Sequence, residues 1–313
     1  ISAPHDEVAK SAAAKLLSSC CEYPWALKTI KKGMLALLEE STFFEDKSSA
    51  LLRTLAETVN CVLDSDKTLL AGLSTQNQGV GAGGITAVFA GRDSDLKSRA
   101  KVIRRISFCL FFGEEQQFNA QVSSVLEKLR DALRVRSNNL TVETFLCLRV
   151  LLLRTGVQSI KHFRASTLTE TIRILEKPFA DPMETAAVLR FLDLVTLLQV
   201  TDFSYELSFF FDSCATSTGR VSESNAPAAE LVARIAETDV AGFQLEEFSH
   251  LRMSGSIPVC GGTLSDISAA FVKAYAMKLC ARVVQSNELQ SQPDVTMINF
   301  ELEQEFHQHE FAS

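Results

Sequence analysis

The stretch from Thr141 to Gly156 constrains the fold most, because it predicts a helix that is apolar on all sides. Thr141 is a candidate N-cap, with Glu143 in the first turn. Arg154 in the last turn and Gly156 directly after it are typical of a helix end. Between these signals the apolar side chains point in nearly every direction around the axis: Phe145, Leu146, Leu148, Val150, Leu151, Leu152 and Leu153. The run is too short to cross a bilayer, which takes roughly 20 apolar residues, so we expect a central helix with other helices packed on both sides.

Apolar stripes at helical spacing recur along the rest of the chain, and no convincing strand pattern appears. Asp181 followed by Pro182 predicts the start of one helix, and Thr263 to Asp266 predicts the start of another. The sequence therefore predicts an all-α fold, an irregular HEAT/armadillo-like helical-repeat stack without a strict period. The first residue is Ile, and we expect residues 1–313 to form a single α-helical C-terminal domain of a longer protein. Flexible loops are expected near 74–96, where four glycines fall within 74–84, and near 213–228.

Composition excludes several classes of function. The net charge of −7 argues against a nucleic-acid binder, which is normally basic overall. The eight Cys include no Cys-x-x-Cys pair and mostly fall inside helical patterns, so free buried thiols are expected. His307 and His309 do not share a helix face and have no evident third ligand, so no metal site is predicted. No catalytic arrangement and no cofactor fingerprint occur, so we expect neither enzymatic activity nor a cofactor.

Basic residues concentrate in one part of this acidic chain. Residues 97–177 hold 15 Lys and Arg against 7 Asp and Glu, a local charge of +8, so the remainder carries −15. Helical spacing places Lys97, Lys101, Arg104 and Arg105 on one arc of a helix, and Phe108 lies on the same arc. Arg130 and Arg134 on the next helix could extend this arc. One interpretation is a solvated face paired with acidic parts of the same molecule; the other is a surface for anionic lipid or an acidic partner. The candidate surface consists of Lys97, Lys101, Arg104, Arg105, Arg130 and Arg134.

Two further arginines lie in the predicted central helix, where a buried charge needs a partner. Arg149 and Arg154 are expected to form structural ion pairs, and Glu143 or Asp193 could supply the carboxylate.

Three blocks of residues, in a fixed order, resemble the C-terminal region of the Dopey family of very large eukaryotic proteins. The first block covers 101–118 and continues over 126–134, the second covers 145–154, and the third covers 191–194 and runs on to 203–212. The most recognisable string is Phe-Leu-Cys-Leu-Arg-Val-Leu-Leu-Leu-Arg at 145–154. The blocks consist mostly of core-type residues, so their order and spacing carry the resemblance.

The resemblance implies a non-enzymatic helical scaffold or adaptor in Golgi–endosome membrane trafficking, peripheral on Golgi, trans-Golgi network and endosome membranes. It implies a partner that is a large helical-repeat protein similar to Arf exchange factors, and binding of phosphatidylinositol 4-phosphate. Through the wider complex it also implies links to lipid-flippase ATPases and to kinesin. The alternative from the residues alone is an unrelated cytosolic helical-repeat module that binds other proteins.

Overall fold

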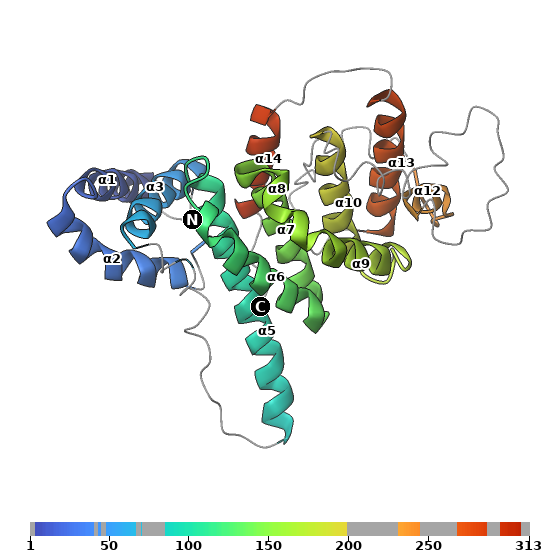
Figure 1. Cartoon of the computed structure of the whole chain (residues 1–313), viewed down its shortest axis with the longest axis horizontal. Coiled ribbons are helices and arrows are strands. Elements are labelled where there is room, and N and C mark those ends of the chain that lie inside the picture. Colours follow the sequence, from blue (N-terminus) through green and yellow to red (C-terminus); the bar gives the residue numbers. More distant parts are fainter. Residues whose placement is uncertain are drawn as a thin grey trace. The chain divides into compact units, whose positions relative to one another are not determined.

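The computed structural model of the chain describes residues 4–40, 43–44, 48–66, 70, 85–198, 231–244, 268–286 and 295–307. Within these ranges the regular structure is helical and includes no strand, which confirms the predicted all-α class. The helices, in chain order, are α1 (Pro4–Cys20), α2 (Pro24–Glu39), α3 (Ser49–Ser65), α5 (Ile85–Phe112), η1 (Asn119–Gln121), α6 (Val122–Val135), α7 (Asn138–Thr155), α8 (Val157–Ile160), η2 (Lys161–Phe163), α9 (Arg164–Leu175), α10 (Pro182–Leu197), α12 (Leu231–Glu237), α13 (Ala269–Ser286) and α14 (Val295–His307) (Figure 1).

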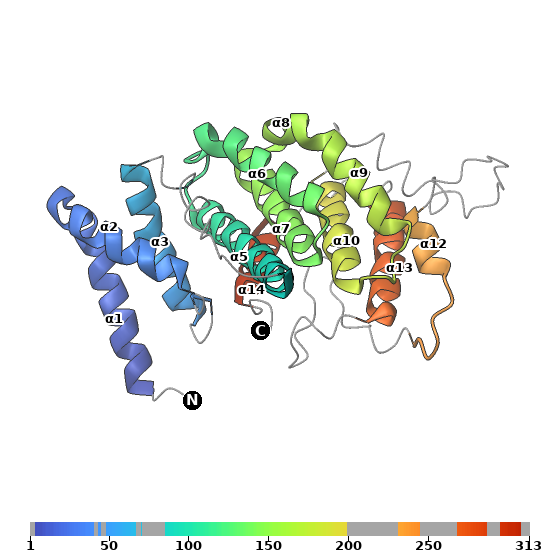
Figure 2. The ribbon, with the colours of Figure 1, turned by 90° about the horizontal axis from the view of Figure 1, so that it is seen from below.

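The contacts within the chain group into two compact units. Unit 1 comprises residues 1–159 and 306–313, and unit 2 comprises residues 160–305. In unit 1, α1 and α2 both pack on α3, α3 packs on α5, and α7 packs against both α5 and α6. Figure 2 shows α5, α6 and α7 side by side from a second direction. In unit 2, α13 packs against α10 and α12, and α9 contacts the same two helices.

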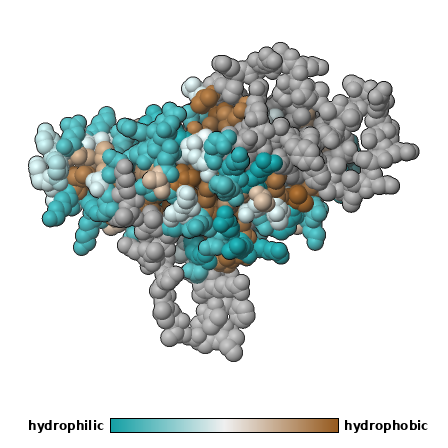
Figure 3. Space-filling model, viewed as in Figure 1, coloured by the Kyte–Doolittle hydropathy of each residue, from teal (hydrophilic) through white to brown (hydrophobic). Residues whose placement is uncertain are grey.

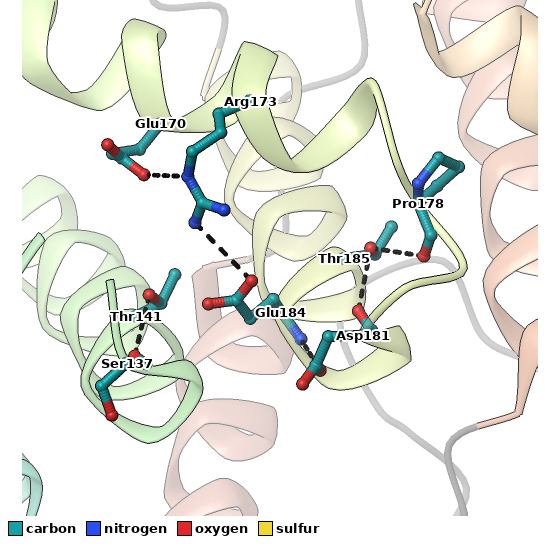
Figure 4. Close-up of polar contacts among 8 residues, drawn as sticks. All are labelled: Ser137, Thr141, Glu170, Arg173, Pro178, Asp181, Glu184 and Thr185. Atoms are coloured by element: carbon teal, nitrogen blue, oxygen red, sulfur yellow. Dashed lines mark hydrogen bonds and ion pairs between the residues drawn. The ribbon is translucent and has the colours of Figure 1, made fainter. Parts of the chain in front are cut away.

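Helix α7 is the predicted central helix, and its residues 143–152 are all buried. The helix ends as expected, since Gly156 follows it with a φ of +77°. The predicted start is wrong, because α7 begins at Asn138 with Ser137 at the N-cap. Thr141 therefore lies in the second turn, where its hydroxyl donates to the Ser137 carbonyl at 3.0 Å (Figure 4), and Glu143 is not in the first turn.

The start of α10 agrees with the prediction from the sequence. The Asp181 carboxylate accepts a hydrogen bond from the Glu184 amide at 2.9 Å, and Pro182 occupies the first helical position. The Thr185 hydroxyl donates back to the Pro178 carbonyl at 2.7 Å, which fixes the turn that enters the helix (Figure 4).

Two other predicted boundaries need revision. Residues 74–84 of the expected loop near 74–96 lie outside the described residues, but residues 85–96 are helical and form the first turns of α5. The long helix expected from Thr263 begins at Ala269, where the Ser268 hydroxyl accepts a hydrogen bond from the Phe271 amide at 3.2 Å. The loop expected near 213–228 and the part of the third block at 203–212 also lie outside the described residues.

Candidate functional site

Two of the arginines that the sequence places on a candidate surface are inside unit 1. Arg104 and Arg105 are only 2% and 5% exposed. The Arg104 Nη1 donates to Glu143 Oε1 at 2.9 Å, and the Arg105 Nη2 donates to the carbonyls of Glu39 and Glu40 at 3.0 and 2.8 Å. Arg104 therefore joins α5 to α7, and Arg105 holds the last carbonyls of α2, which have no partner within that helix.

The reason for this correction is the environment of α5. Residues 102–111 are all buried, because α3 and α7 pack against this half of the helix. Helical spacing correctly places the basic residues on one arc, but it cannot show that other elements cover that arc. Arg104 and Arg105 therefore do not belong to an exposed surface, contrary to the prediction.

Aromatic rings surround the Arg104 guanidinium. Its central carbon lies 5.3 Å from the centroid of the Phe44 ring and 6.0 Å from that of Phe306, distances typical of cation–π contacts. Phe108, which the sequence places on the basic face, is fully buried and contacts the rings of Phe43, Phe44 and Phe306 edge-on. We call Phe43, Phe44, Phe108, Phe111, Phe112 and Phe306 the ring cluster. It is part of the core of unit 1 and carries no sign of a binding site.

The other four residues of the candidate surface reach solvent to different degrees. Lys97 on α5 and Arg134 on α6 are exposed, whereas Lys101 and Arg130 are half-buried. The Arg134 Nη1 lies 3.3 Å from Asp131 Oδ1, one turn earlier on the same helix. An exposed pair of this kind contributes little to stability, so Arg134 remains accessible to an anionic ligand.

The two arginines of α7 differ in their burial and in their neighbours. Arg149 is buried, and the Arg154 guanidinium lies 5.0 Å from the centroid of the Phe111 ring. Burial lowers the pKa of Arg154, and the nearby Glu115 opposes that effect. Of the two carboxylates expected to pair with them, Glu143 accepts from Arg104, and Asp193 accepts from the Tyr275 hydroxyl at 2.9 Å.

Unit 2 contains buried polar links that the sequence reading does not identify. Arg190 and Asp193, one turn apart on α10, face Glu305 and Tyr275 respectively. On the same helix Glu184 lies 3.6 Å from Arg173, which also binds Glu170 at 2.6 Å (Figure 4). These contacts connect α10 to α9, α13 and α14, and their geometry is that of structural links. The i, i+3 spacing of Arg190 and Asp193 in an apolar helix is the only sequence signal that could have indicated them.

The described residues offer little for covalent or metal chemistry. They include no group of three or more His, Cys, Asp and Glu that could hold a metal ion. His307 is the last residue of α14, and His309 lies outside the described residues. The described cysteines are free thiols, as expected. Burial raises the pKa of both Cys109 and Cys147 to about 12, so these two thiols stay protonated and unreactive.

Exposed aromatic residues form a feature that the sequence reading missed. Trp25 and Tyr23 are 74% and 54% exposed, and their ring centroids are 6.3 Å apart. They lie where the chain enters α2, and the exposed Lys28 and Lys32 follow at i+3 and i+7 from Trp25. Figure 3 shows that the part of unit 1 formed by α1–α3 exposes both hydrophilic and hydrophobic residues. The spacing 25, 28, 32 could have been recognised in the sequence as one helix face.

Comparison with known proteins decides the family. Residues 2–256 match the family described as DOP1 C-terminal. The chain belongs to this family. The resemblance to the Dopey family is thereby confirmed, and an unrelated helical-repeat module is excluded.

Relatives from several animals show the same similarity. Protein pad-1 of Caenorhabditis elegans is 30% identical over 171 residues, which cover 53% of this chain and 7% of that protein. The Protein DOP1 homolog of Drosophila melanogaster is 28% identical over 167 residues, covering 52% of this chain and 6% of the relative. Protein DOP1B of Mus musculus is 28% identical over 177 residues, covering 55% and 7%. This Dopey-family chain therefore corresponds to a small part of its relatives, and no solved structure matches it.

None of the helices in the described part combines the length and the apolar character needed to cross a membrane.

Proposed function

We propose that this Dopey-family chain is a non-enzymatic scaffold domain in Golgi–endosome membrane trafficking, acting in protein transport and endosome-to-Golgi recycling. The family match over residues 2–256 carries this proposal. The fold supports it, because packed helices present extended surfaces suited to binding other proteins. The proposed partner is a large helical-repeat protein similar to Arf exchange factors, with a lipid-flippase ATPase and kinesin joining through the wider complex.

The proposal extends to membranes that carry phosphatidylinositol 4-phosphate. The candidate contacts are the exposed Lys97 and Arg134 and the half-buried Lys101 and Arg130. Arg104 and Arg105 are left out, because Glu143 and the carbonyls at the end of α2 already bind them inside unit 1. Each basic residue close to an anionic leaflet contributes about 1 kcal/mol, so these residues add to recruitment by a partner and do not replace it.

The test of the scaffold is capture of the named partner from cells. The tagged chain is expressed in cells, and the captured material is probed with an antibody against the Arf-exchange-factor-like protein, while the chain is located against Golgi and endosome markers. We expect capture of that partner together with Golgi or endosome staining. Absence of the partner, with the chain folded and diffuse in the cell, would contradict the proposal.

The lipid part is tested separately on the purified chain. Neutral vesicles are compared with vesicles that contain phosphatidylinositol 4-phosphate, using the wild type and the Lys97→Glu/Lys101→Glu/Arg130→Glu/Arg134→Glu variant. The expected result is sedimentation that increases with the phosphoinositide and is clearly weaker for the variant than for the wild type. Equal sedimentation of the two proteins would remove these four residues from the lipid contact.

A further inference from the structure

The outer face of α2 combines exposed aromatic and basic side chains. Its inner face is buried through Ala26, Met34 and Leu38, and α2 packs on α3. The opposite side of the helix presents Trp25, Lys28, Thr29, Lys32 and Gly33, all of which are exposed. These positions follow helical spacing, so they form one continuous strip over the first half of the helix. Tyr23 extends the strip by its ring contact with Trp25.

The first half of α2 is basic. Residues 24–38 contain Lys28, Lys31 and Lys32 and no acidic residue. Lys31 pairs with Asp66 at 2.8 Å, so Lys28 and Lys32 supply the positive charge of the outer face. No acidic residue falls between Trp25 and Lys32, and the positive end of the α2 dipole lies at the Trp25 end. The exposed Glu39 and Glu40 lie at the other end of α2, about 20 Å along the axis. The strip from Tyr23 to Lys32 is thus a local positive surface with aromatic rings at its N-terminal end.

We propose that the outer face of α2, with Tyr23, Trp25, Lys28 and Lys32, binds the surface of an anionic lipid membrane. Trp and Tyr rings are amphipathic and prefer the boundary between headgroups and acyl chains. Neighbouring lysines complement the negative charge of such a leaflet. This pattern of aromatic rings and lysines on one helix face is typical of helices that lie on a membrane. The helix would lie on the leaflet without crossing it.

This surface goes beyond the proposed function. It differs from the candidate residues on α5 and α6, and it needs negative charge at the membrane but no phosphoinositide. An acidic protein partner could also bind lysines, and the experiment separates the two, because only a membrane places the indole among acyl chains.

Trp25 is the only tryptophan in the chain, so its fluorescence reports on this face alone. The full chain is mixed with vesicles of phosphatidylcholine, or with vesicles in which about a third of the lipid is phosphatidylserine. We expect a blue shift of the Trp25 emission with the phosphatidylserine vesicles only, and quenching when the acyl chains are brominated. Raising the salt from 0.1 M to about 1 M should reverse the shift, since salt screens exposed charges.

Two variants locate the contact. Lys28→Gln/Lys32→Gln should weaken vesicle binding about thirtyfold, since each lysine close to an anionic leaflet strengthens binding about fivefold. Trp25→Ala removes the fluorescent residue, so its vesicle binding is measured by sedimentation. This binding should be about tenfold weaker than that of the wild type. The matched control is Lys161→Gln/Lys177→Gln, which removes the same charge from two exposed positions elsewhere and should leave binding unchanged.

Three results would overturn the proposal. The first is no binding of the wild type to phosphatidylserine vesicles. The second is binding without a shift or quenching of Trp25, which would place the contact on another surface. The third is an equal loss of binding in the α2 variant and in the control, which would show that only the net charge matters. Failure of phosphatidylinositol 4-phosphate binding at α5 and α6, or of partner capture, would leave these readouts unaffected.

Discussion

Arg104 donates a hydrogen bond to Glu143 across 2.9 Å, and both side chains are buried although 39 residues separate them in the sequence. The pair connects α5 to α7 in the middle of unit 1, and the Phe44 and Phe306 rings flank the guanidinium. Two buried charges of opposite sign are tolerated because each one interacts with the other. If one of them is removed, the remaining charge still carries the free-energy cost of its burial, and the fold is destabilised.

Glu143→Gln should therefore lower the free energy of unfolding by about 3–5 kcal/mol, since it leaves the Arg104 charge inside the protein. Chemical denaturation followed by circular dichroism measures the change. The double variant Arg104→Met/Glu143→Leu should recover much of the loss, because it removes both charges and keeps similar volumes. Asp131→Asn is the control, since its partner Arg134 is exposed, and it should cost less than about 1 kcal/mol. A Glu143→Gln protein as stable as the wild type would contradict the structural role of the pair.

Asp181→Ala should lower the free energy of unfolding by about 1 kcal/mol, because the helix α10 loses the acceptor for the Glu184 amide. Ser48→Ala removes the corresponding acceptor from α3, where the bond to the Leu51 amide is longer, at 3.4 Å. We expect a smaller effect there. Thermal unfolding of the two variants compares them directly, and a larger effect at Ser48 would reverse the predicted order.

Substitution of two glycines by alanine should have opposite effects. Gly156 has a φ of +77° and a ψ of 170°, a conformation that is almost restricted to glycine, so Gly156→Ala should cost about 1–3 kcal/mol. Gly33 lies inside α2 with open space around its Cα, so Gly33→Ala should stabilise the protein by about 0.5–1 kcal/mol. Urea midpoints measure both changes. Destabilisation at position 33 would show that something covers the outer face of α2.

The buried thiols should differ from the exposed one in reactivity. At pH 8 a maleimide should label Cys61, which is exposed, and should leave Cys109 and Cys147 unlabelled until the protein unfolds. Partial removal of water from the Cys61 thiol, together with the nearby Asp64 and Glu57, raises its pKa, so it should react more slowly than a free peptide thiol. Mass spectrometry of the labelled peptides gives the rates, and rapid labelling of Cys147 in the folded protein would be inconsistent with its burial.

The same thiols should make the fold sensitive to alkali. Their pKa is about 12 when folded and about 8.5 when unfolded, so their contribution is complete below pH 8.5 and is lost as the pH rises toward 12. Between pH 8 and pH 10 each thiol should lose about 2 kcal/mol of stabilisation. Urea unfolding at the two pH values should therefore show a smaller loss for Cys147→Ala than for the wild type. An equal loss in both proteins would mean that other groups cause the alkaline effect.

The sequence predicts the helical class and the central helix correctly because apolar periodicity depends only on neighbours along the chain. Residues 143–152 are buried because most of them are apolar. The predicted start of that helix is wrong because Ser137 and Thr141 are both residue types that occur at N-caps, and of the two Ser is the more favoured. The same limit explains the length of α5, since its first turns follow glycines and the polar stretch 91–95 separates Ile85, Val88 and Phe89 from the later apolar stripe.

The candidate surface could be predicted only in part. The helical wheel gives the arc that contains Arg104 and Arg105, but the partners that cover it come from residues 39, 40 and 143. Arg104 and Arg105 were expected at the surface but are buried, whereas Trp25 is of a residue type expected in the core but is exposed. Its exposure becomes evident only once the buried face of α2 is known. In both cases burial depends on contacts that are distant in the sequence, and local pattern carries no information about them.

The ring cluster also sets an order of events during synthesis. Phe306 contacts Phe44, Phe108 and Phe111, yet the ribosome makes it 194 residues after Phe112. At a rate of 5–20 residues per second, the aromatic core of unit 1 stays open for about 10–40 s before its last ring emerges. Until then the nascent chain exposes a set of Phe rings, so completion of this core is a late step relative to the synthesis of its first rings.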